Sequence, residues 1–422
     1  MPQRYEIKGF DQKGRGLGTG AGTGETLNIP FTYPGDIVEA ELLNKHKKTG
    51  RLINILEPSP DRQTPPCPHF AKCGGCSWHG LTYEAQLKHK AERVRNLFGE
   101  AGQIIPSPDL YHYRNRMDYA FGPDYSIGLK DRNNYIVDIE KCSLMSEESV
   151  AIMDRLRYFI RFKKLVAHRE GIMRHVIIRE GKNIKNTILN ILTSDKDRFP
   201  LEEFWEKMQD LVQGVTWAIN LSPADRSYGD IQQTFGQDYY MESLHGIKFK
   251  VPVQSFFQTN VKQAEKLLDI VKDFADLQRG ETLLDLYSGT GSIGLSLADR
   301  AKEVVGVEEN EPATELSKEN ARLNGINNFS ALAGRAEKVI GSLEGKFDTI
   351  IMDPPRPGVH KNVLRKLGET RPAKIVYVSC NPFTQKYDAE KLKEFGYKIE
   401  RCQPLDMFPH TPHMENVILL TL

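Results

Sequence analysis

TLLDLYSGTGSIGLSLA, residues 282–298, decides the fold of the larger part of this chain. An apolar strand-like segment runs into the glycine pattern G-x-G-x-x-G at Gly289, Gly291 and Gly294, and an apolar helical segment follows. Glycines at such a turn let the backbone approach a ligand closely. The stretch therefore predicts a cofactor site at the end of a strand in a parallel α/β sheet.

The chain on both sides of this stretch alternates between helical and strand patterns from about residue 260 onward. Such alternation predicts a doubly wound parallel sheet, in which ligands bind beyond the carboxyl ends of the strands. The expected helices are 261–275, 292–300 and 311–325, and the expected strands are 282–287, 303–308, 329–334, 347–355, 375–380 and 416–422.

Acidic residues near the strand ends bear on the kind of cofactor. Glu308 ends the strand after the glycine turn, where an acid bonds ribose hydroxyls of a dinucleotide or of S-adenosylmethionine. Asp285 favours S-adenosylmethionine, because a carboxylate there repels a pyrophosphate but suits a zwitterionic methionine with its sulfonium. Asp353 ends a later strand, before two prolines, and is either a turn-forming residue or a cofactor contact.

The N-terminal part has a different pattern. Residues 4–57 alternate short apolar stretches with glycine-rich turns, which predicts a small closed β-barrel. The basic segment 46–51 is either a solvated turn or a contact to a phosphate backbone. The proline-rich stretch 57–68 predicts a domain boundary. We therefore expect domains at 1–58, 59–250 and 251–422, the central one of α+β type.

Cysteines of the central part suggest a metal centre. Cys67, Cys73 and Cys76 lie close together around a Gly-Gly pair, and Cys142 follows 66 positions after Cys76. Four soft sulfur ligands suit a [4Fe-4S] cluster. A structural zinc is the alternative, although zinc sites usually show two paired CxxC motifs. With four protein ligands, a cluster has no open iron, so we expect it to hold the domain together.

The overall composition sets limits on the class of protein. The 422 residues carry 57 Lys and Arg against 56 Asp and Glu, a net charge of +1, so a nucleic-acid partner requires a local basic face. The sequence has no long apolar run and no secretory signal pattern at its start. We expect a cytoplasmic, monomeric protein without a membrane segment.

Five motifs occur in a fixed order in the C-terminal half: FFQTN, DLYSGTGSIG, DPPRPG, SCNP and HMEN. In this order they resemble the RNA uracil-C5 methyltransferases, which use S-adenosylmethionine to make 5-methyluridine. The resemblance implies that Cys380 is the nucleophile and Glu415 the general base. It also implies that four residues hold the cofactor: Gln258, Tyr287, Glu308 and Asp353. The cysteine quartet and the barrel resemble the iron–sulfur motif and the TRAM domain of the same family.

The chemistry of that reaction requires these residue types. Uracil C5 is too weak a nucleophile to take a methyl group, so a thiolate must first add to C6. A carboxylate must then remove the C5 proton before the thiolate can leave. Without the resemblance, Cys380 is equally typical of a small buried residue on an apolar strand, and Glu415 of a solvated charge. Cys402 has no acidic or cofactor-site motif near it and is expected to be structural. His410 and His413 either orient Glu415 or the target base, or are ordinary loop residues.

The expected substrate is an RNA loop or single strand from which a uridine is flipped. Basic and aromatic residues mix in 111–121 and 155–164, where they form either an RNA surface or a solvated face. A chain with both the cysteine quartet and the barrel resembles the branch of this family that methylates 23S rRNA. A tRNA uridine-54 methyltransferase is the alternative. An iron–sulfur redox enzyme or sensor that uses a nicotinamide, and an inactive RNA-binding module, are alternatives of other classes. The joint presence of Cys380 and Glu415 argues against the last.

Overall fold

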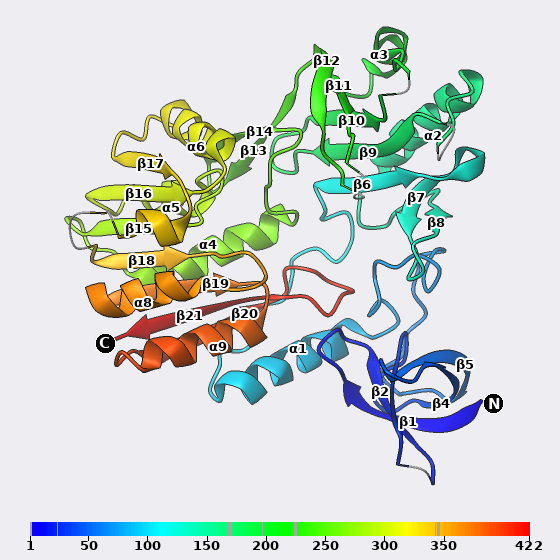
Figure 1. The fold of residues 1–422 in the computed structure, drawn as a ribbon, viewed down its shortest axis with the longest axis horizontal. Coiled ribbons are helices and arrows are strands. Elements are labelled where there is room, and N and C mark those ends of the chain that lie inside the picture. The colour runs from blue at the N-terminus through cyan, green and yellow to red at the C-terminus, as the bar shows by residue number, and fades with distance from the viewer. Residues whose placement is uncertain are drawn as a thin grey trace.

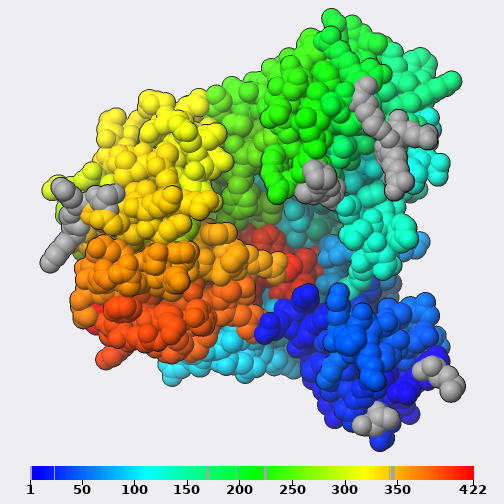
Figure 2. All heavy atoms as spheres, viewed as in Figure 1, coloured from blue at the N-terminus to red at the C-terminus, as the bar shows by residue number. Residues whose placement is uncertain are grey.

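The computed structural model describes residues 2–22, 24–167, 171–195, 197–222, 226–341, 343 and 347–422. Three parts follow one another along the chain: a small barrel, a central mixed sheet, and a C-terminal sheet between two layers of helices (Figure 1). In the space-filling view, the barrel and the central part lie on the same side of the C-terminal part, with a hollow where the three meet (Figure 2).

The N-terminal barrel closes in the strand order β1-β2-β3-β5-β4. Its strands are β1 (Gln3–Phe10), β2 (Gly16–Gly20), β3 (Thr26–Ile29), β4 (Ile37–Asn44) and β5 (Thr49–Glu57). Alternate side chains, among them Tyr5, Ile7, Leu27 and Val38, point inward and form its core. Closure pairs every strand and leaves no exposed edge. The barrel predicted over 4–57 is therefore confirmed, and the basic segment 46–51 covers the β4–β5 turn and the start of β5.

The central part is built on a seven-stranded sheet in the order β12-β11-β10-β9-β6-β7-β8. Its strands are β6 (Arg116–Phe121), β7 (Ile127–Lys130), β8 (Ile136–Asp138), β9 (Met173–Glu180), β10 (Thr187–Thr193), β11 (Gly214–Ile219) and β12 (Asp230–Gly236). Helices α2 (Glu147–Phe162) and α3 (Leu201–Met208) pack their apolar faces on this sheet and form one core with it. This arrangement agrees with the α+β character expected for the region.

The C-terminal sheet has the order β17-β16-β15-β18-β19-β21-β20, in which β21 runs antiparallel to β19. The strands are β15 (Thr282–Leu286), β16 (Glu303–Glu308), β17 (Phe329–Ala333), β18 (Thr349–Met352), β19 (Lys374–Ser379), β20 (Lys398–Leu405) and β21 (Glu415–Thr421). The helices are α4 (Val261–Ala275), α5 (Ser292–Leu297), α6 (Glu311–Leu323), α7 (Ala336–Val339), α8 (Lys361–Thr370) and α9 (Pro382–Lys393). The predicted Rossmann-like sheet is confirmed.

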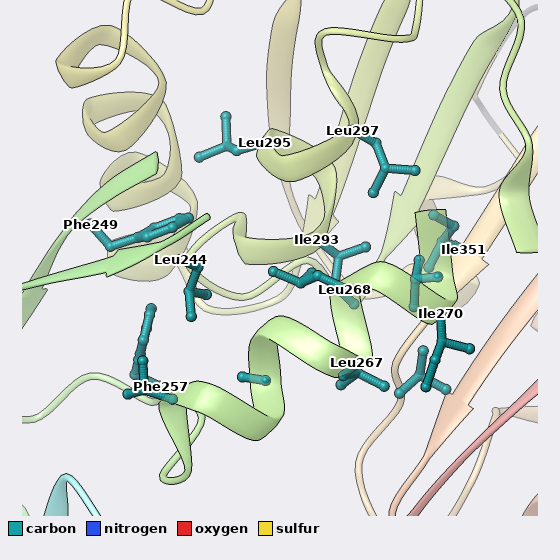
Figure 3. Close-up of a cluster of buried hydrophobic side chains, with 14 of the residues drawn as sticks. Leu244, Phe249, Phe257, Leu267, Leu268, Ile270, Ile293, Leu295, Leu297 and Ile351 are labelled. Carbon is teal, nitrogen blue, oxygen red and sulfur yellow. The ribbon is translucent and has the colours of Figure 1, made fainter. Parts of the chain in front are cut away.

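Helix α4 forms much of the core on one face of this sheet. Asn260 caps the helix, since its side chain accepts a hydrogen bond from the Gln263 amide. Apolar residues at helical spacing then face the sheet, and Figure 3 shows Leu268 of α4 next to Ile293 of α5. Helices α7, α8 and α9 cover the other face. The sheet is thus buried on both sides, as a parallel sheet requires.

Two segments from the expected central range bury their apolar residues with the C-terminal sheet. Helix α1 (Tyr83–Phe98) contributes Val94 and Phe98 to the core beside α9. The hairpin of β13 (Tyr239–Leu244) and β14 (Ile247–Pro252) packs against α4. The three domain ranges stay a prediction. Within the described ranges, no helix has the length and apolar character needed to cross a membrane.

Candidate active site

The glycine-rich turn lies at the carboxyl end of β15, a central strand of the C-terminal sheet. Gly289 and Gly291 have φ angles of 54° and 85°, in the left-handed region that glycine adopts most easily. A Cβ on Gly294 would lie 2.9 Å from Asp285 Oδ2, so only glycine lets α5 approach β15 this closely. The three glycines are therefore explained by the backbone, and they open the strand end to a ligand.

Two carboxylates accept hydrogen bonds from backbone amides of this turn and its helix. Asp285 Oδ2 accepts a hydrogen bond from the Gly294 amide at 2.9 Å, and Glu308 Oε2 accepts one from the Gly289 amide at 3.0 Å. Burial, with Asp353 and Glu308 nearby, raises the pKa of Asp285 to about 7. In the described part of the chain, Asp285 Oδ1 and Ser288 Oγ are buried without a hydrogen-bond partner. Because such atoms are normally paired, they fit a polar ligand at this turn.

Two further residues, Tyr287 and Gln258, are predicted to hold the cofactor. Tyr287 adopts φ 64°, an uncommon conformation for a bulky residue, directly before the glycine turn. Its ring is half-buried, and burial raises its pKa to about 12. Gln258 precedes α4, and its carbonyl accepts a hydrogen bond from Asn115 Nδ2 at 2.9 Å. The hydrogen bond seen for Gln258 thus goes to the central part and not to another predicted site residue.

Strand pairing brings the predicted nucleophile and base together. Ser379, the last residue of β19, pairs with Asn416 of antiparallel β21. Cys380 follows Ser379 and Glu415 precedes Asn416, so the two residues adjoin the last pair of this ladder, and Glu415 acts on the pKa of Cys380. Their sequence separation of 35 residues is bridged by α9 and β20. The structure therefore places Cys380 and Glu415 side by side.

Asp353 connects this pair electrostatically to the glycine turn. Its carboxyl raises the pKa of Asp285 on one side and those of Glu415 and Cys380 on the other. Burial raises the pKa of Asp353 itself to about 7. Glu415 is only 4 % exposed, and burial together with Asp353 raises its pKa well above the ordinary range. Without a bound ligand, Asp285 and Asp353 therefore hold their protons far more than exposed carboxyl groups do near pH 7, and the neutral form of Glu415 is favoured most.

The Cys380 thiol is half-buried and is influenced by the same two carboxyl groups, Glu415 and Asp353. Burial, then the neighbouring Glu415 and Asp353, raise its pKa to about 11, while Arg356 acts in the opposite direction. Arg356 comes from the DPPRPG loop, and its Nη2 lies 3.3 Å from Nδ1 of His413. Sequence reasoning did not single out Arg356, whose signal is its position three residues after Asp353.

Hydrogen bonds join the loops that carry Asp353 and Cys380. Asn381 Nδ2 donates to the Arg356 carbonyl at 3.2 Å, and the Asn381 side chain also caps α9. Behind them, Gln385 Nε2 donates to the carbonyls of Tyr377 and Asn416 at 2.8 and 3.0 Å. Buried amide networks of this kind fix positions tightly when every group is satisfied. Strands β19 and β21 are thereby locked in register beneath Cys380.

The comparisons with known proteins agree with this geometry. A family model described as tRNA (Uracil-5-)-methyltransferase matches residues 82–422. An RNA methyltransferase of Nanoarchaeum equitans named as uncharacterized is 40 % identical, over 100 % of this chain and 93 % of that protein. The tRNA (uracil(54)-C(5))-methyltransferase of Pyrococcus horikoshii is 38 % identical, over 93 % of this chain and 95 % of that protein. The chain belongs to the RNA uracil-C5 methyltransferase family.

One solved structure of a relative is similar to this methyltransferase over nearly its whole length. The crystal structure of Pyrococcus abyssi tRNA (uracil-54, C5)-methyltransferase, in complex with S-adenosyl-L-homocysteine, matches with a TM-score of 0.84. The match covers 99 % of this chain and 100 % of that one at 32 % identity. The predicted activity, S-adenosylmethionine-dependent methylation of uracil C5 in RNA, is thereby confirmed.

The four cysteines of the methyltransferase's central part lie near one another. Burial raises the pKa of Cys76, and the thiols of Cys142, Cys73 and Cys67 add to the effect. All four are free of disulfides. However, no group of three or more Cys, His, Asp or Glu side chains arranged to hold a metal is found where the structure is described. The iron–sulfur cluster therefore stays a prediction.

The basic stretch 155–164 divides into structural and exposed residues. Arg157 is buried and donates to Asp138 and to the Ile127 and Ile139 carbonyls, so it is not available to RNA. Arg155 pairs with Asp210. Tyr158 and Phe162, by contrast, are exposed and stack on each other with centroids 6.2 Å apart. The expectation of an RNA surface is thus wrong for Arg157.

Proposed function

We propose that Cys380 is the nucleophile of this methyltransferase and that Glu415 is its general base. One observation carries the proposal: antiparallel pairing of β19 and β21 sets the two residues side by side, within the field of Asp353 at the cofactor turn. A thiol and a carboxyl group that share a buried rim next to a cofactor site match the two steps that C5 methylation needs.

The order of events follows from the chemistry. The Cys380 thiol gives its proton to solvent and Sγ bonds to C6, which moves the ring's electrons to O4 and makes C5 nucleophilic. C5 then takes the methyl group and still carries its hydrogen. Glu415 removes this proton, the C5–C6 double bond returns, and the Sγ–C6 bond breaks. Glu415 must therefore be ionised when it acts, although burial and Asp353 favour its neutral form in the free protein.

The same site suits the methyl donor. S-adenosylmethionine supplies, when bound, a methyl group on a positively charged sulfur. Four residues would hold it: Gln258, Tyr287, Glu308 and Asp353. The fit rests on the unpaired buried atoms Asp285 Oδ1 and Ser288 Oγ and on the open glycine turn. A positive charge beside Asp353 and Glu415 lowers their pKa values, so a bound cofactor favours the ionised base.

We also propose that four cysteines hold a [4Fe-4S] cluster: Cys67, Cys73, Cys76 and Cys142. The donor set supports this, because the four thiols influence one another and two of them, Cys73 and Cys142, pack against the core of the central sheet. A Cβ on Gly74 would lie 2.7 Å from the Lys130 carbonyl, so glycine lets this loop approach β7. A bound cluster would join the cysteine-bearing loop to Cys142. Iron and sulfide analysis after anaerobic purification distinguishes this from zinc.

For the RNA target, we propose uridine 54 of tRNA as the first site to test, flipped out of its stack. The support is that relatives at 35 to 38 % identity are named tRNA (uracil(54)-C(5))-methyltransferases. The preference for 23S rRNA stays a prediction. Mapping 5-methyluridine in tRNA and rRNA from a deletion strain separates the two. Loss from position 54 alone supports the tRNA proposal, and loss from 23S rRNA alone contradicts it.

Trapping with 5-fluorouridine RNA tests the nucleophile directly, because fluorine at C5 cannot be removed as a proton. The wild-type enzyme with S-adenosylmethionine should form an adduct that survives denaturing electrophoresis, and Cys380→Ala should form none. Cys402→Ala is the matched control, since Cys402 is buried and its sulfur contacts Asn416 at 3.5 Å. An adduct in Cys380→Ala would remove Cys380 from the mechanism.

A further inference from the structure

The loop between β20 and β21, residues 406–414, joins parts of the molecule that are distant in sequence. We call it the base loop, because Glu415 follows it directly. In Figure 1 it is the red loop that extends beyond the sheet toward α1 and the central part, and in Figure 2 red atoms are visible in the hollow where the three parts meet. Its contacts come from helix α1, the cysteine-bearing loop, the segment of Leu110 and Tyr111, and the barrel.

Helix α1 holds the base loop by its two ends. Lys90 Nζ donates to Asp406 Oδ1 at 2.5 Å and to the Phe408 carbonyl at 3.1 Å, and both charged side chains are fully buried. One turn further along, Arg93 Nη1 donates to the Pro412 carbonyl at 3.0 Å. A buried charge that loses its partner is strongly destabilising, so separating α1 from the loop costs much free energy.

His410 is the middle of the loop and is 1 % exposed. Its backbone amide donates to Gln86 Oε1 at 2.7 Å, and its carbonyl accepts from the Trp78 amide at 2.9 Å. Its Nε2 lies 3.0 Å from the Leu110 carbonyl and its Nδ1 lies 3.4 Å from Gln86 Nε2. The carbonyl requires a donor and the amide nitrogen an acceptor, so Nε2 carries the proton. Burial lowers the pKa of His410 to about 3 and keeps the ring neutral.

The ring of His410 also stacks on the cysteine-bearing loop. Its centroid lies 4.2 Å from that of His79 and 5.0 Å from that of Tyr111. His79 comes three residues after Cys76, and its Nε2 lies 3.1 Å from the Tyr111 hydroxyl. The base loop therefore rests on the segment that follows the cysteine cluster.

The barrel reaches the same place through Trp78. Its indole Nε1 donates to the Gly14 carbonyl at 2.8 Å, in the loop between β1 and β2. A Cβ on Gly14 would lie 2.3 Å from Pro412 Cβ, so barrel and base loop are in close contact. Gly14 has φ 73°, which this turn requires. Barrel, cysteine loop and α1 thus all contact one nine-residue loop.

We propose that His410 is a positioning residue through which the cysteine-bearing loop and helix α1 set Glu415 for removal of the C5 proton. This inference rests on the proposed role of Glu415. His410 has φ 67°, so the loop keeps an uncommon backbone conformation that its four polar contacts and two ring contacts hold in place. A small displacement of a general base costs much of its rate, because proton transfer needs hydrogen-bond distance.

The expected defect is specific to one step. Cys380 is held by hydrogen bonds of Asn381, Gln385 and the Arg356 carbonyl, all within the C-terminal part. The Arg356 side chain contacts His413 of the base loop, but His410 takes no part in these hydrogen bonds. Loss of the His410 contacts should therefore leave thiol addition and methyl transfer nearly intact. Proton removal and release of the RNA should slow, and the methylated covalent complex should accumulate.

Single-turnover rapid quench with radiolabelled methyl donor and the RNA substrate measures both steps. For His410→Ala we expect methyl transfer within about twofold of wild type and release slowed at least about tenfold. His410→Asn should retain more of the release rate, since Asn tolerates the left-handed backbone and can accept from Gln86. His245→Ala is the matched control: His245 also has a positive φ, of 48°, but pairs with Asp269 on α4.

Two results would overturn the proposal and leave His410 with a structural role alone. One is equal slowing of methyl transfer and release in His410→Ala, and the other is a release rate in His410→Asn no higher than in His410→Ala. If His410→Ala does not fold, Gln86→Met removes both Gln86 contacts to His410 and should give the same accumulation; its absence there overturns the proposal equally. Glu415→Gln is run beside them. Normal release in Glu415→Gln contradicts the proposed base, whereas accumulation in Glu415→Gln without accumulation in the His410 variants contradicts only the positioning role.

Discussion

The proposed nucleophile and the proposed base of this methyltransferase share the C-terminal sheet but differ in what else holds them. Cys380 is supported from within the C-terminal part, by the cap of α9 and by Gln385 beneath it. Glu415 follows a loop that contacts the barrel, the cysteine-bearing loop and α1. Glu415 is also paired with Leu405 of β20 within the C-terminal sheet. The thiol is therefore placed by the C-terminal part, whereas the base is placed by this sheet together with a loop that contacts the rest of the chain.

The largest expected effect separates the two residues by chemistry. Glu415→Gln should lower turnover by about 10²- to 10⁴-fold, the usual share of a general base, and should leave a methylated RNA–protein complex. Cys380→Ala should lose turnover without any complex. Gel shift under denaturing conditions with labelled methyl groups measures both. A Glu415→Gln enzyme that turns over normally would end the assignment of the base.

Breaking the buried ion pair between Lys90 and Asp406 tests how helix α1 supports the base loop. Lys90→Met leaves the Asp406 carboxylate buried without its partner and should cost about 3–5 kcal/mol of the free energy of unfolding. The double variant Lys90→Met/Asp406→Leu should recover part of this loss, because no charge stays buried. Urea titration of the wild type, Lys90→Met, Asp406→Leu and the double variant gives the coupling free energy between the two side chains. Lys262→Met is the control, since Lys262 pairs with Asp109 at the surface.

Asp353 should destabilise the protein that has no cofactor. Its pKa is raised from 3.8 to about 7, so the folded state holds its proton while the unfolded state releases it. Stability from this group is full below pH 4 and falls as the pH rises from about 4 to 7. Asp353→Asn should therefore raise Tm at pH 7.5 by about 2 °C and flatten this pH dependence, while weakening cofactor binding. An unchanged Tm profile between pH 4 and 8 would contradict the buried carboxyl.

The smallest effect concerns the cation beside the thiol. Arg356 lowers the pKa of Cys380, which burial, Glu415 and Asp353 raise to about 11. Arg356→Gln should shift the pH dependence of Cys380 alkylation further upward, and Arg356→Lys should restore it. Mass spectrometry of the Cys380 peptide across pH measures the rate. Arg365→Gln, on the exposed pair with Glu369, should leave the profile unchanged.

Sequence patterns predicted the C-terminal sheet well where periodicity is strong. The helix expected at 261–275 has those bounds, and the strand at 303–308 agrees as well. Helices α8 and α9 and strand β20 were not predicted. Their segments are short and carry many charges. Their secondary structure therefore depends on burying residues such as Val363, Leu392 and Cys402 in the core of the sheet rather than on local pattern.

The amino-acid sequence by itself determined the closed barrel, the parallel sheet, the glycine turn and the family, because each depends on local periodicity or on motifs of adjacent residues. Only the tertiary structure decided that Arg157 is buried, that α1 packs on the C-terminal sheet, and that Cys380 meets Glu415 across two strands. It alone also brought Gly14, His79 and Lys90 onto the base loop. Contacts between residues about 300 positions apart leave no periodic trace in the sequence, since they arise when separate elements bury their faces together.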